Sequence, residues 1–223
     1  MIAPHRAATP RLRMPRFPRR GLYAITPETL RGDALAAAVR AALEGGASVV
    51  QYREKSRDEG RRSADAEAVL RICDEHRAPL IVNDDTALAR RIGAAGAHVG
   101  RDDISLPLAR RALGEEAIIG VSCYDDLDRA LCAYRAGADY VAFGSFFPSR
   151  TKPGAVRATV ELVEAARRTI DVPIVAIGGI TASNAPALVR AGVDVIAVIE
   201  ALFGADDIRV AAAALLRAFE DGR

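Results

Sequence analysis

Short apolar runs rich in β-branched residues alternate with longer stretches rich in Ala, Leu and Arg from Gly21 onward. This alternation is typical of repeated β-α units, in which each apolar run is a buried strand and each longer stretch is an amphipathic helix. We expect eight strands, spaced by roughly the length of one strand, one helix and two loops. They are predicted at residues 22–25, 48–52, 80–82, 98–99, 118–121, 140–143, 174–177 and 195–198.

A recurring glycine precedes four of the predicted strands, at Gly46, Gly96, Gly137 and Gly192. Glycine adopts the left-handed conformation that ends a helix without a Cβ clash, so each is expected to be the residue that turns the chain into the next strand. Eight β-α units in about 200 residues predict an α/β protein with a single (β/α)8 TIM barrel over residues 21–223. A doubly wound open sheet is the alternative.

The composition favours one folded domain. With 223 residues, of which 50% are hydrophobic, the chain has enough apolar material for a core. Neither a run of about 18–20 apolar residues nor a secretory signal is present, which predicts a cytoplasmic protein with no membrane partner. Its three cysteines lack C-x-x-C spacing and favour neither a disulfide framework nor a zinc site, as fits a reducing cytoplasm.

Positive charge gathers at the N-terminus. Residues 1–20 contain six arginines, four prolines and no acidic residue, and the rest of the chain is mildly acidic. A Pro-rich segment of this kind cannot hold a helix and has little to bury, so residues 1–20 are predicted to be an extended or disordered tail. An RNA-binding or targeting arm is the alternative to a plain solvated segment. We expect no nucleic-acid partner.

The residues after each predicted strand are the candidate site, because the C-terminal ends of the strands form the active-site face of a barrel. After the second strand, extended geometry turns Gln51, Arg53 and Lys55 to one side. Arg offers a planar fork to phosphate oxygens, Lys a mobile point charge, and Gln both donates and accepts. This trio suits a polyanion, and a solvated strand end is the alternative.

Acidic residues follow the third and fourth predicted strands. Mg²⁺ typically takes one or two carboxylates together with phosphate oxygens and water, so Asp84 and Asp103 are the expected Mg²⁺ ligands. One alternative is that the aspartates cap the next helices, which best suits Asp85 and Asp102. Another is that Asp84 and Asp103 act as a general acid and base.

Hydroxyl groups and cations dominate the next two strand ends. Ser122 ends the fifth strand without a G-x-S-x-G frame, and we expect it to donate a hydrogen bond to phosphate. A long polar loop follows the sixth strand and carries Ser149, Arg150, Thr151 and Lys152. This composition predicts a lid or an anion clamp, with a plain connector as the alternative.

A second anion site is predicted at the last two strands. Gly178 and Gly179, before a helix expected near Thr181, let bare backbone N–H groups approach an anion where barrels often bind phosphate. Ile199 and Glu200 follow the eighth strand and would add further N–H groups. Together with the cationic site at strands two to six, this predicts an enzyme that acts on two phosphorylated substrates.

Seven motifs in this order resemble the thiamine-phosphate synthase family, and the resemblance extends from Gly21 to about Phe203. The motifs are LYAIT from residue 22, Q-x-R-E-K from residue 51, VND from residue 82, H-V-G-x-x-D from residue 98, GVS from residue 120, TK from residue 151 and IGGI from residue 177. Each motif alone is modest, and their order and spacing make the set specific.

The resemblance implies a transferase that joins a hydroxymethylpyrimidine diphosphate to a thiazole phosphate, giving thiamine phosphate and pyrophosphate. It implies Mg²⁺ on Asp84 and Asp103. The residues that would hold the pyrimidine diphosphate are Gln51, Arg53, Lys55, Asn83, Ser122 and Lys152. Those that would hold the thiazole phosphate are the 149–151 segment, Gly178, Gly179 and the backbone of Ile199 and Glu200. Arg53, Lys55, Lys152 and Ser122 would stabilise the departing charge.

Two other functions remain open on the same barrel. A thiazole tautomerase-like isomerase would not need Lys55, Asp84, Asp103 and Lys152 together, and Tyr124 stands where its histidine would be expected. A noncatalytic sensor of phosphate ligands would have no use for leaving-group stabilisers. Metal-dependent product formation separates the synthase, the isomerase and the sensor. Whether the chain forms a homo-oligomer stays open.

Overall fold

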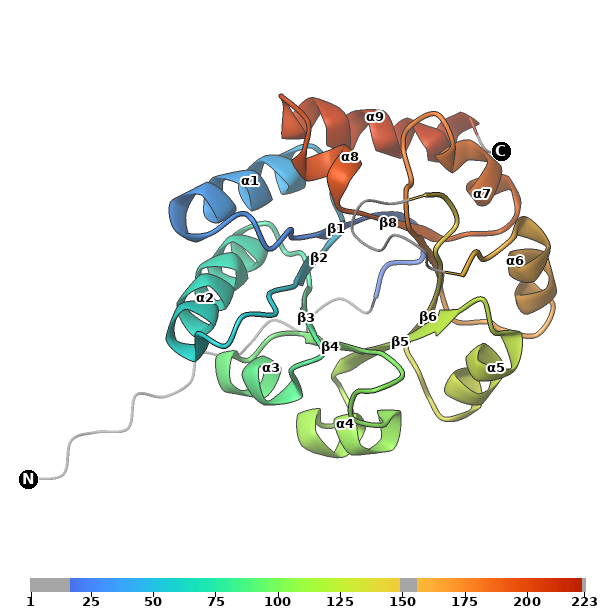
Figure 1. Ribbon diagram of the computed structural model, residues 1–223, viewed down its shortest axis with the longest axis horizontal. Helices are drawn as coiled ribbons and strands as arrows, with labels where there is room; N and C mark the ends of the chain where they lie inside the picture. The colour runs from blue at the N-terminus through green and yellow to red at the C-terminus, as the bar shows by residue number, and fades with distance from the viewer. Residues whose placement is uncertain (1–16, 149–155, 222–223) are drawn as a thin grey trace, which may run out of the picture.

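Eight parallel strands close into a barrel in the computed structural model, which describes residues 17–148 and 156–221. The strands follow one another around the ring in chain order, and β1 pairs with both β2 and β8 (Figure 1). Their bounds are β1 Gly21–Ile25, β2 Val49–Tyr52, β3 Leu80–Asn83, β4 Gly96–Val99, β5 Ile118–Tyr124, β6 Tyr140–Phe143, β7 Ile174–Ile177 and β8 Val195–Val198.

Helices form the outer ring (Figure 1). Within the described residues none is long and apolar enough to cross a membrane. Their bounds are α1 Gly32–Glu44, α2 Glu59–Glu75, α3 Thr86–Ile92, α4 Leu106–Leu113, α5 Leu127–Arg135, α6 Val160–Arg167, α7 Ala185–Arg190, α8 Glu200–Phe203 and α9 Ile208–Asp221. The predicted (β/α)8 barrel is confirmed, with α8 as an additional short helix before α9.

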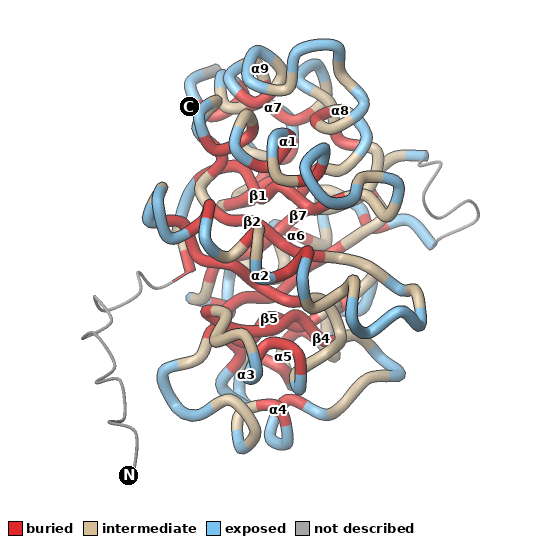
Figure 2. Tube along the Cα trace, turned by 90° about the vertical axis from the view of Figure 1, so that its left-hand side faces the viewer, coloured by how far each residue is buried: buried red, intermediate tan, exposed pale blue. Residues whose placement is uncertain are grey.

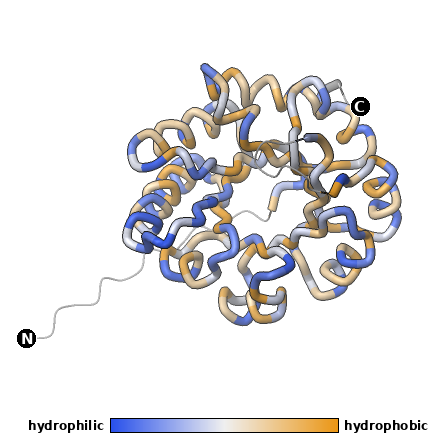
Figure 3. Tube along the Cα trace, in the orientation of Figure 1, coloured by the Kyte–Doolittle hydropathy of each residue, from blue (hydrophilic) through white to orange (hydrophobic). Residues whose placement is uncertain are grey.

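The alternation of side chains along each strand separates two apolar cores. On β1, Leu22 and Ala24 face the helices and join the larger core, and Tyr23 and Ile25 face the inside of the barrel. The strands are buried along their length, and the helices are exposed on their outer sides (Figure 2). Figure 3 shows the hydrophilic residues gathered on connections such as the one between β2 and α2. Both faces of the sheet are therefore covered, as a parallel barrel requires.

All eight predicted strands are present, and five differ from their predicted extents: β1, β2 and β3 by one residue at one end, β4 and β5 by more. β5 continues to Tyr124 with a bulge between Ser122 and Tyr124. β4 begins at Gly96, which was expected to end the preceding helix. That role belongs to Gly93, whose φ is 72°. A Cβ at Gly96 would lie 1.7 Å from the carbonyl oxygen of Ile118, so this glycine is required by the close approach of β5.

The segment before β1 takes part in the core. Phe17 is 5% exposed, stacks on Tyr140 with ring centroids 3.8 Å apart, and meets the edge of Tyr23 at 5.6 Å. Arg20 donates to the carbonyl of Phe219 on α9. The expectation that residues 1–20 have little to bury is therefore wrong for Phe17, although residues 17–20 form neither helix nor strand, and residues 1–16 lie outside the described residues.

Two aspartates, each just before a strand, connect a helix arginine to the N–H at the start of a neighbouring strand, and we call each arrangement a clasp. Asp194, before β8, accepts from the N–H of Ile174 at 2.7 Å and from Arg167 on α6. Asp139, before β6, accepts from the N–H of Ile119 at 2.8 Å and from Arg110 on α4 at 2.7 Å. Both clasps lie at the end of the barrel opposite the strand ends that carry the predicted site.

Candidate active site

A cavity of about 750 Å³ opens at the C-terminal ends of the strands. Its lining includes eight of the predicted site residues: Gln51, Arg53, Asn83, Ser122, Gly178, Gly179, Ile199 and Glu200. These residues come from β2, β3, β5, β7 and β8 or from the segments that follow them. The barrel therefore brings together residues that lie up to about 150 positions apart in the chain, as the site of a TIM barrel requires.

A chain of hydrogen bonds crosses the floor of this cavity. The amide of Gln51 donates to the hydroxyl of Tyr23 at 2.8 Å, and that hydroxyl lies 2.9 Å from the hydroxyl of Tyr140. The His98 ring then joins Tyr140 (Nδ1, 2.9 Å) to the Ser122 hydroxyl (Nε2, 2.8 Å). Because each group is held by its neighbours, Gln51 and Ser122 are fixed on opposite sides of one polar floor.

Burial keeps this floor uncharged around the two tyrosines. Burial raises the pKa of Tyr23 and of Tyr140 well above 10, so both hydroxyls are protonated at neutral pH. Gly120 makes room for the ring of Tyr140, since a Cβ at Gly120 would lie 1.9 Å from its Cζ. The glycine of the GVS motif thus makes room for the packing of Tyr140 in the floor.

The predicted cations at the end of β2 face two acids. The N–H of Arg53 donates to the hydroxyl of Thr26 at 3.0 Å, and its Nη1 lies 2.5 Å from Oε1 of Glu28. Lys55 does not line the cavity. Its Nζ lies 3.5 Å from Oδ2 of Asp84, so Lys55 forms an ion pair with a predicted metal ligand beside the cavity. Of the two predicted cations, Arg53 therefore lines the cavity and Lys55 does not, and their roles stay predictions.

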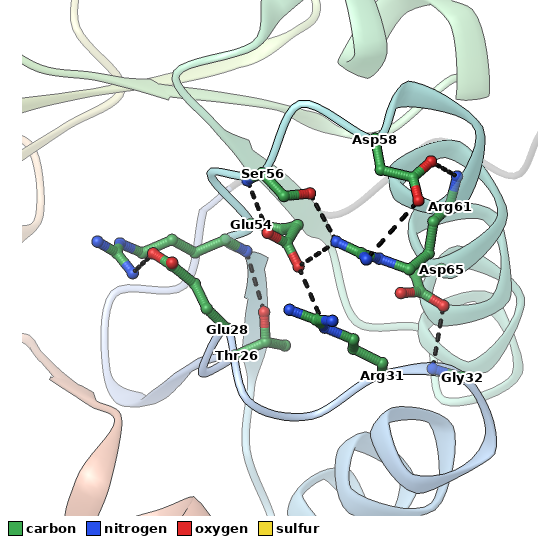
Figure 4. A network of polar contacts seen from close by, with 10 residues as sticks. Thr26, Glu28, Arg31, Gly32, Glu54, Ser56, Asp58, Arg61 and Asp65 are labelled. Atoms are coloured by element: carbon green, nitrogen blue, oxygen red, sulfur yellow. Dashed lines mark hydrogen bonds and ion pairs between the residues drawn. The ribbon is translucent and has the colours of Figure 1, made fainter.

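Glu54 holds the segment after β2 in place through contacts with Ser56, Arg61 and Arg31, as Figure 4 shows. Its side chain is 5% exposed, and its carboxylate accepts from the N–H of Ser56 at 2.8 Å and contacts Arg61 at 3.4 Å and Arg31 at 3.9 Å. Burial alone would raise the pKa of Glu54, but the bonds from Ser56 and the two arginines outweigh it and lower that pKa. Gln51 and Arg53 of the Q-x-R-E-K motif thus line the cavity, and Glu54 fixes the backbone of the segment that follows them.

The two predicted metal ligands lie beside each other. Burial raises the pKa of the Asp84 carboxyl, the nearby Asp103 carboxyl raises it further, and Lys55 lowers it. Asp84 has a left-handed backbone with φ of 62°, a strained conformation found at functional sites. Of the two alternative capping residues, Asp85 caps α3 by accepting from the N–H of Leu88 at 2.8 Å. For Asp102 the alternative is wrong, because the N-cap of α4 is Ser105.

The two glycines after β7 are held by the segment after β6. Gly178 and Gly179 have φ of 105° and 61°, and added Cβ atoms would lie 2.0 Å from Oγ of Ser145 and 2.4 Å from the carbonyl oxygen of Pro148. The helix expected near Thr181 begins at Ala185 and is six residues long. The glycines therefore line the cavity without standing at the start of a helix, which removes the helix-dipole part of the prediction.

Ile199 and Glu200 line the cavity at the start of α8.

The predicted clamp residues Ser149, Arg150, Thr151 and Lys152 lie outside the described residues, so their predicted roles stay predictions. Burial raises the pKa of the Cys123 thiol to about 12, and the side chain is fully buried, as fits a residue that packs in the core.

Sequence reasoning missed several residues that shape the cavity. Tyr23 and Tyr140 face inward by the same period-two alternation that placed Gln51, and that signal was available. Arg101 and Tyr124 line the cavity together, with the Arg101 guanidinium 4.8 Å from the centre of the Tyr124 ring. Arg129, on α5, contacts the site through the backbone carbonyls of Ser122 and Gly100 and through the Tyr124 ring, and no motif pointed to it.

Comparisons with known proteins agree with this geometry. The sequence profile of the family described as thiamine monophosphate synthase matches residues 22–202. A protein named thiamine-phosphate synthase from Nitrosococcus oceani is 54% identical over 202 residues, covering 90% of this chain and 93% of the relative. One of the same name from Methylococcus capsulatus is 50% identical over 207 residues, covering 93% and 92%.

Solved structures give the same result. A thiamine phosphate pyrophosphorylase from Pyrococcus furiosus superposes with a TM-score of 0.81 at 34% identity, covering 91% of this chain and 96% of that chain. A geranylgeranylglyceryl phosphate synthase from Thermoplasma acidophilum, at 18% identity and a TM-score of 0.70, shares the fold. The resemblance found in the motifs is confirmed over nearly the whole barrel, and the chain belongs to the thiamine monophosphate synthase family.

Proposed function

We propose that this protein is a thiamine-phosphate synthase, a transferase that joins a hydroxymethylpyrimidine diphosphate to a thiazole phosphate. The observation that carries the proposal is the cavity itself. It has a polar floor with two protonated tyrosines, Arg53 on the β2 side with Lys55 and the Asp84–Asp103 pair beside it, and a glycine-lined backbone surface on the β7–β8 side. These two sides match two phosphorylated substrates whose reacting ends meet over the floor.

The residues of the β3–β4 side fit Mg²⁺. Asp84 and Asp103 bring two carboxylates together in a half-buried position, where their mutual repulsion favours either a proton or a cation between them. No cluster of three or more His, Cys, Asp or Glu side chains occurs among the described residues. Two carboxylates suit Mg²⁺, which typically completes its shell with phosphate oxygens and water. Bound there, Mg²⁺ would supply positive charge to the departing pyrophosphate.

In the proposed first step, the bond between the pyrimidine methylene carbon and the diphosphate oxygen breaks, and its electron pair leaves with the pyrophosphate. We assign Arg53, Lys55 and the Ser122 hydroxyl to stabilising the charge that develops on the leaving group, which is supported by Arg53 and Ser122 in the cavity lining and by Lys55 beside Asp84. We assign the same role to Lys152, on the strength of the family motif. Gln51 and Asn83 line the same side of the cavity and would orient the pyrimidine diphosphate.

In the proposed second step, the lone pair of the thiazole nitrogen forms the new C–N bond, so no proton has to be removed and no redox partner is needed. The distant phosphate of the thiazole would be held by the backbone around Gly178, Gly179, Ile199 and Glu200, with the 149–151 segment. Fixing that phosphate turns the second step into an oriented encounter. A cytoplasmic location belongs to the same proposal, and the three free thiols support it.

The experiment is a fixed-time assay of the purified protein with both substrates and Mg²⁺, in which thiamine phosphate and pyrophosphate are quantified by chromatography. The expected result is equimolar formation of the two products, abolished by a chelator and by omission of either substrate. Turnover of a thiazole phosphate alone into an isomer would establish the tautomerase function instead. Stabilisation by both ligands with no product would establish the sensor.

A further inference from the structure

The end of β5 is irregular where it reaches the site. Ser122 pairs with Ala142 of β6, and Tyr124 pairs with the next residue, Phe143, so Cys123 is an extra residue in a bulge. Tyr124 has a φ of 56°, in the left-handed region that a residue with a Cβ rarely adopts. Such a conformation persists only where the surrounding contacts determine it.

Arg129 makes those contacts from α5. Its Nε donates to the carbonyl of Ser122 at 2.7 Å, and its guanidinium lies 5.8 Å from the centre of the Tyr124 ring. Its own backbone is fixed as well, because its N–H donates to the capping Asp126 at 2.9 Å. The Arg129 guanidinium therefore contacts the bulged segment at both the Ser122 carbonyl and the Tyr124 ring.

The same guanidinium reaches the neighbouring strand end. Nη2 of Arg129 donates to the carbonyl of Gly100 at 3.0 Å, and the N–H of Gly100 donates to Oδ2 of Asp103 at 2.7 Å. A Cβ at Gly100 would lie 2.9 Å from that oxygen, so the backbone and the carboxylate are in tight contact. One side chain thus links Ser122 on β5 to Asp103 after β4.

We propose that Arg129 is a positioning residue that sets the Ser122 hydroxyl and the Asp103 carboxylate at the separation needed to bind a metal-bound diphosphate between them. The inference rests on the proposed function, because it takes Ser122 and Asp103 as groups that contact the diphosphate and its metal. Arg129 does not line the cavity in the described part of the chain, and two of its nitrogens are engaged with carbonyls. It acts through the backbone rather than as a further cation for the substrate.

The test is Arg129→Lys, because lysine keeps the charge and loses the planar fork that reaches two carbonyls at once. The matched control is Arg110→Lys. Arg110 likewise donates to backbone carbonyls, those of Glu115, Ala117 and Gly137, at the opposite end of the barrel. A merely structural arginine and a positioning arginine therefore predict different results for the two variants.

Calorimetry with pyrophosphate and Mg²⁺ measures the affinity of the proposed diphosphate side without turnover. We expect Arg129→Lys to weaken this affinity by about 10–100-fold, the usual effect of losing a residue that orients a metal ligand. The KM for the pyrimidine diphosphate is expected to rise and that for the thiazole phosphate to stay within twofold. Arg110→Lys is expected to lower Tm and leave both affinities unchanged.

The proposal is overturned if Arg129→Lys binds pyrophosphate with Mg²⁺ within twofold of the wild type, or if Arg110→Lys loses the same affinity. It is also overturned if the wild type does not bind pyrophosphate with Mg²⁺. A wild type that binds pyrophosphate and forms no thiamine phosphate would contradict the proposed function alone, and the affinity comparison would still decide the role of Arg129. If Arg129→Lys does not fold, Arg129→Gln is measured against the same criteria.

Discussion

Replacing Phe17 by alanine is expected to destabilise the whole barrel, although Phe17 lies before the first strand. The ring is 5% exposed and belongs to the apolar cluster inside the barrel. It stacks on Tyr140 at 3.8 Å with an interplanar angle of 16° and meets Tyr23 edge-on at 5.6 Å. Tyr140 in turn holds His98, so the packing of Phe17 supports the floor of the cavity.

The size of the effect follows from these contacts. Truncating a buried phenylalanine to alanine costs about 3–5 kcal/mol, through lost burial and the cavity that remains. For a chain of this size, that loss lowers Tm by about 6–20 °C. Phe17→Leu keeps most of the apolar volume and loses the ring stacking, which is worth about 0.5–1.5 kcal/mol per aromatic pair, so it should lie between wild type and Phe17→Ala.

Urea denaturation followed by circular dichroism measures the change in free energy of unfolding, with Tm from the same samples. Val210→Ala is the control, because Val210 is 58% exposed and its truncation should change stability by less than about 0.5 kcal/mol. A loss below about 1 kcal/mol in Phe17→Ala would mean that the ring does not fill the barrel in solution.

Three further predictions concern the scaffold. Gly120→Ala should lower stability by several kcal/mol in thermal denaturation, since its Cβ would lie 1.9 Å from the ring of Tyr140, and an unchanged Tm would contradict this packing. Asp194→Ala should lower the free energy of unfolding by about 1.5–3 kcal/mol in urea denaturation, because it removes the acceptor of the Ile174 N–H and of the Arg167 guanidinium. A decrease below about 0.5 kcal/mol would show that water replaces these hydrogen bonds. Because the pKa of Glu54 is lowered in the folded state, its carboxylate contributes stability that is present above pH 4.5 and is lost as pH falls below it. The free energy of unfolding, measured from pH 6 to pH 3, should therefore fall less steeply in Glu54→Gln than in the wild type. Parallel pH profiles of the two proteins would contradict this.

The architecture of this protein was accessible from its sequence because each β-α unit is locally consistent. The period-two runs at residues 140–143, 174–177 and 195–198 are strands over those same residues in the structure. The C-terminal ends of the strands then placed Gln51, Arg53, Asn83 and Ser122 around one cavity. These predictions needed only hydrophobic alternation and the rule that a barrel carries its site at one end.

What the sequence did not reveal depends on contacts between distant segments. Gly96 carries the same motif as three helix-ending glycines, and the carbonyl of Ile118 on the next strand is what requires a glycine there. Phe17 sits among prolines and arginines, and its burial depends on space left inside the closed barrel. Arg129 acts on two carbonyls that meet only when β4 and β5 are paired.

The role of the two carboxylates is tested by the initial rate of thiamine phosphate formation as a function of Mg²⁺ concentration, in the wild type, Asp84→Asn and Asp103→Asn. If the two carboxylates hold the metal that stabilises the departing pyrophosphate, each folded variant should lose at least about 100-fold in rate at limiting Mg²⁺. Circular dichroism confirms that each variant is folded. A folded variant of either aspartate that keeps a rate near that of the wild type at limiting Mg²⁺ would contradict the account.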